Sequence, residues 1–353
     1  MQLFFELLQV ALGRRSSLSR NPSKGEWMEL FAVSQKQTVV GFAFAALDNL
    51  GNNGVNPPKE LLFEWIGISE QIKNQNRIVN QRCAEITKKF SNEGWRTCIL
   101  KGQGNALMYP RPLSRMPGDI DIWVDASKED VADFVWEQFP EAKVIEHHAQ
   151  YPIFDDVEVE VHFRPVSAVS VRYDKCLDSF FMGQKDAQFQ HNVNLPDKAG
   201  TVHIPTVEFN VSYQMAHMMK HFFSEGLGLR HLMDYYYVLM SNEMQIGKDY
   251  TSVFQKLGML KFAKAVMWVL GDVFLLDRQK MVCEPDERRG KLLLQEVMTG
   301  GNFGHGDKRF AKRLITKSST LSLLIRNANL FWLFPEEAIM APVSNVIRRL
   351  KNG

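Results

Sequence analysis

Hydrophobic periodicity changes twice along this chain of 353 residues, and these changes limit the fold more than any other feature of the sequence. Residues 1 to about 95 and residues from about 205 to the end repeat their apolar positions at helical spacing, whereas residues 96–200 alternate as strands do. The pattern predicts an α+β protein, in which a small mixed sheet is flanked by helical regions. We expect three parts: residues 1–95, 96–200 and 201–353.

The best-defined elements have recognisable ends. Apolar residues three, four and seven apart predict a helix over residues 69–90, with Gly94 as its stop signal and residues 52–59 as the connector before it. The capping pattern Ser127-x-x-Asp130 predicts a helix over residues 127–138. The other predicted elements are strands over 97–100, 120–124 and 157–163, and helices over 105–109, 209–224 and 229–240.

Composition indicates an ordinary globular protein, with 45% hydrophobic residues and a net charge of +2. So small a charge argues against bulk coating of nucleic acid. The four cysteines, Cys83, Cys98, Cys176 and Cys283, are widely spaced and indicate free thiols. No apolar run reaches the roughly 20 residues needed to cross a bilayer. We expect a cytoplasmic protein that does not bind membranes.

The segment around Asp119 and Asp121 contains the most informative chemistry. Two aspartates two residues apart on a strand project from the same face, where both can hold metal ions, while Ile120 between them faces the core. Gly118 removes a side chain beside them and leaves room for a phosphate. Carboxylates and substrate phosphates are the ligands that Mg²⁺ prefers. A solvated strand edge or a turn is the alternative for an isolated Asp-x-Asp pair.

Two neighbouring segments strengthen the metal hypothesis. Upstream, the strand at 97–100 ends in Lys101-Gly102-Gln103-Gly104, whose backbone N–H groups could bind an anion at a helix start. Downstream, the alternating strand 157–163 presents Glu160 on its polar face as a third carboxylate. Glu158 shares this face and is the alternative to Glu160.

Two segments, when they are read together, resemble the polymerase-β-type nucleotidyltransferase superfamily: residues 99–125, ILKGQGNALMYPRPLSRMPGDIDIWVD, and residues 157–165, VEVEVHFRP. They are most similar to a poorly characterised bacterial branch whose pattern runs LKG, R, DIDIxV and ExH. Residues 90–95 and 217–234 extend the resemblance on both sides. The superfamily usually has Gly-Ser in the turn where this chain has Gly102-Gln103.

The resemblance implies a small mixed-sheet nucleotidyltransferase core with an NTP as substrate and two Mg²⁺ (or Mn²⁺) ions as cofactors. It implies that Asp119 and Asp121 bind both ions, and that Glu160 binds one of them or deprotonates the acceptor. The candidate phosphate-binding residues are Lys101, Gly102, Gln103, Gly104, Arg115 and Gly118. For Lys101 and Arg115, an ordinary surface cation is the alternative.

Histidines near these segments are candidate supporting residues. His162 lies two residues after Glu160 and could orient it, or it could be satisfied by neighbouring backbone. His217 and His221 share one helix face, but Met218 stands where a zinc-binding HExxH motif requires glutamate, so zinc is not expected there. This polar stripe could instead line the cleft where the helical region covers the sheet. Arg230 and Asp234 are spaced to stabilise one helix.

The leading hypothesis is an enzyme that transfers a nucleoside monophosphate from an NTP to an unidentified acceptor, a small molecule or a protein. The missing turn serine motivates an alternative: a non-catalytic nucleotide-binding or interaction protein with the same fold. A nucleotidyltransferase that modifies RNA or tRNA is a third, weaker possibility, because the net charge is close to neutral.

Overall fold

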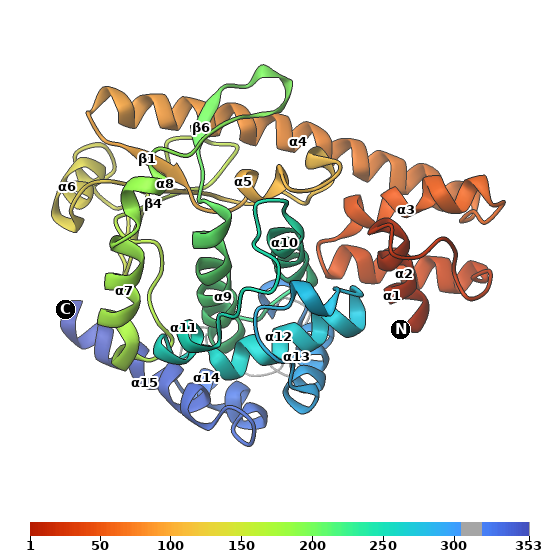
Figure 1. Cartoon of the computed structure of the whole chain (residues 1–353). Coiled ribbons are helices and arrows are strands. Elements are labelled where there is room, and N and C mark those ends of the chain that lie inside the picture. The colour runs from red at the N-terminus through yellow and green to blue at the C-terminus, as the bar shows by residue number, and fades with distance from the viewer. Residues whose placement is uncertain (305–319, 353) are drawn as a thin grey trace.

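The computed structural model describes residues 1–304 and 320–352 of the chain. Helices form both ends, and short strands lie between them (Figure 1). The first helices are α1 (Gln2–Ala11), α2 (Lys24–Lys36), α3 (Val40–Asn52) and α4 (Lys59–Asn92). The middle elements are β1 (Thr97–Ile99), α5 (Gln103–Ala106), β2 (Ile120–Val124), α6 (Lys128–Gln138), β3 (His148–Gln150), β4 (Val159–His162), α7 (Asp174–Met182), α8 (Lys185–Gln188), β5 (Asn192–Asn194) and β6 (Thr201–His203). The last helices are α9 (Val207–Ser224), α10 (Leu229–Met240), α11 (Thr251–Lys256), α12 (Leu260–Val273), α13 (Glu287–Gly300), α14 (Thr320–Asn327) and α15 (Pro335–Asn352).

A four-stranded mixed sheet with the strand order β1-β2-β4-β3 lies at the centre of the middle region. Strand β2 runs antiparallel to β1 and parallel to β4, and β3 runs antiparallel to β4. Strands β5 and β6 form a separate hairpin. The predicted α+β class with a small mixed sheet is therefore confirmed.

The apolar face of this sheet packs against the long helix α4, which crosses above it in Figure 1. Helix α4 buries the predicted stripe at Val79, Cys83, Ile86 and Phe90, and Ile122 of β2 lies in the same cluster of buried residues. Complete burial of one such side chain contributes about 1.5–3 kcal/mol. This packing therefore determines which face of β2 is left for polar side chains.

The opposite face of the sheet is covered by α9 and α10, which lie below it in Figure 1. Trp123 of β2 is fully buried on this side, and its ring centroid lies 4.7 Å from that of Phe189 and 6.0 Å from that of Phe209 in α9. Side chains alternate along a strand, so Asp121 projects from the same face as Trp123. The aspartate thus lies between the sheet and α9, and only 2% of it is exposed.

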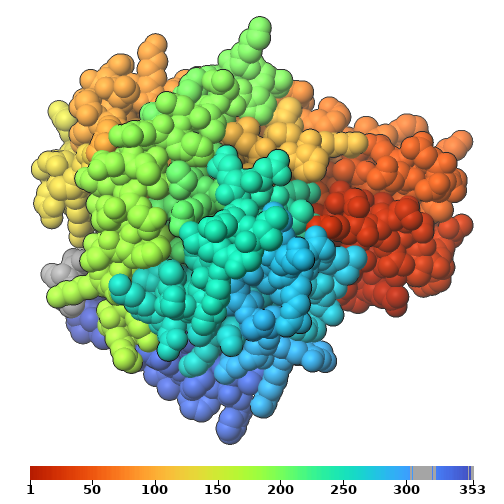
Figure 2. Space-filling model, in the orientation of Figure 1, coloured from red at the N-terminus to blue at the C-terminus, as the bar shows by residue number. Residues whose placement is uncertain are grey.

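The two helical ends of the chain share one hydrophobic core. Leu7 of α1 belongs to the same cluster of buried residues as Tyr213 of α9 and Phe262 of α12. Side-chain hydrogen bonds join the same regions, for example from Gln9 Nε2 to the carbonyl oxygen of Val273 at 2.9 Å. Figure 2 shows the N-terminal segment, in red, directly against the cyan and blue C-terminal helices. The division at residues 95 and 200 remains a prediction from sequence.

Most predicted elements form where the sequence indicated them. Helix α6 begins with the predicted capping box, in which Ser127 accepts a hydrogen bond from the backbone N–H of Asp130. The predicted helix at 105–109 is instead the four-residue α5, because residues 107–109 continue as turns. The four cysteines are free thiols, as predicted. Within residues 1–304 and 320–352, no helix combines the length and the hydropathy that spanning a bilayer requires.

Candidate active site

The parallel pairing of β2 with β4 brings two of the predicted carboxylates together. Asp121 and Glu160 are direct neighbours across the two strands. Asp119 lies two residues before Asp121, just outside the first residue of β2. The side chain of Asp121 is 1% exposed, whereas those of Asp119 and Glu160 are 31% and 28% exposed. The arrangement is thus one buried carboxylate between two that solvent or a ligand can reach.

Lys101 provides the positive charge that balances this group of acids. Its Nζ lies 3.0 Å from Asp121 Oδ2 and 3.6 Å from Asp119 Oδ2. Burial alone would lower the pKa of Lys101, but the charges of Asp119, Asp121 and Glu160 outweigh burial and raise it. Lys101 is therefore charged, and its side chain is held by the two aspartates.

His162 connects the buried aspartate to Glu160. Its Nε2 lies 2.9 Å from Asp121 Oδ1 and 3.6 Å from Glu160 Oε2. Burial lowers the pKa of His162, but the bonds to the two carboxylates outweigh burial and raise it to about 9. The pKa of Asp121 is lowered, because Lys101 and His162 together overcome the effect of its burial. The structure thus places His162 where it can orient both acids, the first of the two roles considered above.

Glu158, the alternative to Glu160, lies outside this group. It precedes β4 and is exposed. Glu160, by contrast, is in contact with two imidazoles, since His148 Nε2 lies 3.3 Å from its Oε1. A ligand bound to Asp121 would therefore meet Glu160 rather than Glu158.

The turn after β1 approaches the carboxylates through its backbone. Gly102 has a φ of +62°, which a side chain would strain, and a Cβ there would meet the carbonyl oxygen of Asp119 at 3.6 Å. The side chain of Gln103 points the other way, because its Nε2 donates hydrogen bonds to Asn76 and Asn80 on α4. Gln103 therefore cannot bind a phosphate with its side chain in this arrangement. Gly104 is packed against Ile204, where a Cβ would lie 3.0 Å from the isoleucine side chain.

Arg115 has a different environment from the one expected of a phosphate contact. Its guanidinium is 5% exposed and donates two parallel hydrogen bonds of 2.8 Å to the carboxylate of Asp234 on α10. Tyr109 donates a third bond of 2.6 Å to the same carboxylate. The buried carboxylate of Asp234 thus binds the guanidinium in this arrangement, and a phosphate contact of Arg115 stays a prediction from sequence. Asp234 also pairs with Arg115 rather than with Arg230.

Arg230 is the cation that sequence reasoning missed. It donates to the carbonyl oxygens of Met116 and Pro117 at 3.3 and 3.2 Å. A Cβ added at Gly118 would lie 3.5 Å from its Nη1, so the space beside Gly118 opens onto this guanidinium. Its Nε is buried and has no hydrogen-bond partner among the described residues. The sequence did not indicate that Arg230 lies beside Gly118, because its i, i+4 spacing to Asp234 is also typical of a pair that stabilises one helix.

Helix α9 closes the site on the polar face of the sheet, the side that lies below the sheet in Figure 1. Tyr213 is fully buried, and burial together with the charges of Asp121 and Asp119 raises its pKa. His217 follows one turn later, and burial and the nearby Lys101 ammonium lower its pKa. His221 lies another turn on and pairs with Glu225 at 3.1 Å. That the stripe of His217 and His221 lines a cleft over the sheet stays a prediction from sequence.

Comparison with known proteins agrees with this geometry. The family model described as "Uncharacterised nucleotidyltransferase" matches residues 23–274, which include the sheet, α4, α9 and α10. No curated protein matches the chain. The crystal structure of an antigenic nucleotidyltransferase-like protein from Paracoccidioides brasiliensis has 11% sequence identity and a TM-score of 0.34, with 61% of this chain and 96% of that chain covered. That likeness is too distant to bear on fold or activity. The family model matches most of the length of this chain, and the chain therefore belongs to the uncharacterised nucleotidyltransferase family.

Proposed function

We propose that this protein is a metal-dependent enzyme that transfers a nucleoside monophosphate from an NTP to the hydroxyl or phosphate of an unidentified acceptor. One observation carries the proposal: Asp121 and Glu160 are paired in register across β2 and β4, with Asp119 next to them on the same face. Three carboxylates that converge beside a glycine turn meet the needs of phosphoryl transfer with two metal ions.

The side chains present fit Mg²⁺ or Mn²⁺. The group already binds a cation, because the Lys101 ammonium lies between Asp119 and Asp121. Carboxylate oxygens are hard ligands of the kind that Mg²⁺ takes together with substrate phosphates. Asp119, Asp121 and Glu160 would hold the ions. When bound, the ions supply positive charge that neutralises the charge developing on the transferred phosphoryl group.

The remaining side chains bind the nucleotide and control protons. Lys101 is free to turn toward a phosphate once another cation balances the aspartates, since its flexible stem carries a mobile point charge. Arg230 lies beside Gly118 and takes the phosphate-contact role expected of Arg115. Glu160 accepts the proton of an acceptor hydroxyl or contributes a ligand oxygen. His162 keeps Asp121 ionised and oriented through its 2.9 Å contact.

A nucleotide transfer assay with matched variants tests the proposal. Wild type, Asp119→Asn, Glu160→Gln and Glu158→Gln are incubated with α-labelled NTPs and MgCl₂, and pyrophosphate release and labelled products are measured. We expect Asp119→Asn and Glu160→Gln to lose about 10²-fold or more of the rate, as removal of a transition-state charge contact does. Glu158→Gln, an exposed change in the same segment, should keep it. Equal transfer by wild type and Asp119→Asn would refute the proposal.

The position of Gln103 supports one other function, that of a non-catalytic nucleotide-binding or interaction protein. Its side chain stands where the superfamily turn has serine and is bonded to Asn76 and Asn80 instead of facing the carboxylates. Calorimetry with a non-hydrolysable NTP separates the two functions. Binding that requires Mg²⁺ supports the enzyme, whereas binding indifferent to Mg²⁺, together with no pyrophosphate release from the ordinary NTP, supports the non-catalytic protein.

A further inference from the structure

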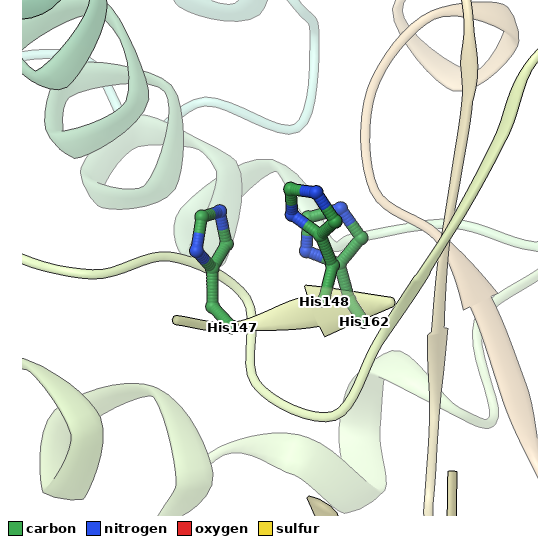
Figure 3. A group of neighbouring side chains, drawn as sticks. All are labelled: His147, His148 and His162. Carbon is green, nitrogen blue, oxygen red and sulfur yellow. The ribbon is translucent and has the colours of Figure 1, made fainter. Parts of the chain in front are cut away.

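Three histidines form a cluster beyond Glu160, at the edge of the site. The imidazoles of His147, His148 and His162 have ring centroids 4.7–5.2 Å apart. Each offers one nitrogen that lies within 4.8 Å of the nitrogens of the other two. In Figure 3 all three rings lie on the same side of the strand, and His148 and His162 each turn a ring nitrogen toward His147. All three residues are buried, with 7%, 6% and 2% of their surface exposed.

The backbone holds the three rings in this arrangement. In the antiparallel pairing of β3 with β4, His148 lies directly opposite His162. The carbonyl oxygen of His147 accepts a hydrogen bond of 3.1 Å from the backbone N–H of Phe163. Two of the three rings are thus held by paired strands, and His147, in the bend just before β3, is held by this backbone hydrogen bond to Phe163. Metal ligands require such rigid support.

The contacts of His148 and His162 with carboxylates leave one nitrogen of each ring without a hydrogen-bond partner among the described residues. Nε2 of His162 is in contact with Asp121 at 2.9 Å, and Nε2 of His148 lies 3.3 Å from Glu160. The Nδ1 atoms of both rings are buried and have no hydrogen-bond partner within the described parts of the chain. Burying such polar atoms unpaired is unfavourable. A histidine that ligates a metal characteristically donates its other nitrogen to a carboxylate. His162 is hydrogen-bonded to Asp121 in this way, and Nε2 of His148 lies 3.3 Å from Glu160 Oε1.

We propose that His147, His148 and His162 form a binding site for a divalent transition metal ion of the Zn²⁺ class, separate from the Mg²⁺ ions held by the carboxylates. Imidazole nitrogen suits Zn²⁺, whereas carboxylate oxygen suits Mg²⁺, so the two donor sets select different ions. With three protein ligands the zinc ion keeps a fourth position for water or a ligand. The inference concerns binding alone and holds whether or not the protein transfers nucleotides.

Two positive charges oppose this site: the proton of His162, which the metal ion has to displace, and the ammonium of Lys220, which has to move. Nζ of Lys220 lies 3.3 and 3.4 Å from the two ring nitrogens of His147. The same ammonium already donates to Ser167 Oγ at 2.8 Å and lies 3.5 Å from Glu146 Oε2. A small rotation of its flexible stem toward Glu146 would release His147. Lys220→Met removes this competing charge and should therefore tighten zinc binding.

Metal titration of the full-length protein tests the proposal. The protein is freed of metal by a chelator, saturated with MgCl₂ and titrated with Zn²⁺ by calorimetry and with Co²⁺ by visible absorption. We expect one Zn²⁺ per chain and a tetrahedral Co²⁺ spectrum. His147→Gln and His148→Gln should weaken binding at least about 10-fold, a loss that even an outer-shell partner can cause. His191→Gln, whose imidazole is hydrogen-bonded to the carbonyl oxygen of Ile204, is the matched control and should bind as wild type.

Two results would overturn the inference. One is the absence of Zn²⁺ binding by wild type in the presence of Mg²⁺. The other is zinc affinity that survives in His147→Gln and His148→Gln but is lost in Asp119→Asn, which would place the ion at the carboxylates. If a histidine variant fails to fold by circular dichroism, Cu²⁺-loaded wild type decides the matter by electron paramagnetic resonance. Coupling to three nitrogens supports the site, and a spectrum with oxygen ligands alone refutes it.

Discussion

Asp234→Ala should destabilise the protein by about 3–5 kcal/mol, because it leaves the buried charge of Arg115 without a partner. The two side chains are 5% and 3% exposed and are joined by two bonds of 2.8 Å. The same carboxylate accepts the 2.6 Å bond from Tyr109. The pair connects α10 to the segment that leads into Asp119, so its loss should also reduce nucleotide transfer.

Urea unfolding followed by circular dichroism measures this loss as a change in the midpoint at constant slope. The control is Asp186→Ala, which removes a carboxylate that is 69% exposed and lies 2.8 Å from Arg96. An exposed pair of this kind contributes about 0–1 kcal/mol. The double variant Arg115→Met/Asp234→Leu should recover most of the stability, since it removes both buried charges. A loss in Asp234→Ala no larger than in Asp186→Ala would refute the reasoning.

Three further changes have defined outcomes. Lys101→Met should lower the Tm in the absence of divalent ions, because buried Asp121 loses its counter-charge. In a thermal-shift assay, MgCl₂ should restore much of the lost Tm. A Tm of the variant that does not respond to Mg²⁺ would argue against a metal at this position. Gly102→Ala should cost about 1–3 kcal/mol in urea unfolding, because φ is +62° and ψ is −107°, and an unchanged midpoint would contradict the strain. Burial is the main cause that raises the pKa of Glu337 above its ordinary value of 4.5. The contribution of this group to the stability of the folded state is therefore complete below pH 4.5. It is lost as the pH rises through the raised pKa. Glu337→Gln should therefore raise the Tm at pH 7 more than at pH 4.5, and an equal shift at both would exclude ionisation as the cause.

Local signals predicted most of the secondary structure. The stripe of α4, the capping box at Ser127 and the bounds of β2 all form as expected, because apolar spacing and caps act within a few residues of one another. The predicted helix after Gly104 shrank to one turn, since its neighbours are fixed by contacts with α4 and the β5–β6 hairpin rather than by local propensity.

Partners distant in sequence could not be predicted in the same way. Arg115 pairs with Asp234, 119 residues away, and nothing in the sequence around Arg115 indicates this partner. The side chain of Gln103 likewise donates to a distant residue, Asn80 of α4, which lies 23 residues earlier in the chain. The exposed or buried state of a cation depends on which element packs over it, and the sequence around it does not contain that information.

The sequence by itself determined the fold class and the placement of Asp121 on the face of β2 opposite to Ile120 and Ile122, because side-chain alternation follows from the backbone geometry of a strand. Only the tertiary structure decided that β4 pairs with β2 in the register that sets Glu160 beside Asp121. It also decided that His148 of β3 and His147 just before it lie beside His162. Strand register depends on which buried faces fit together across the sheet, and a shift of one residue would have turned Glu160 away from Asp121.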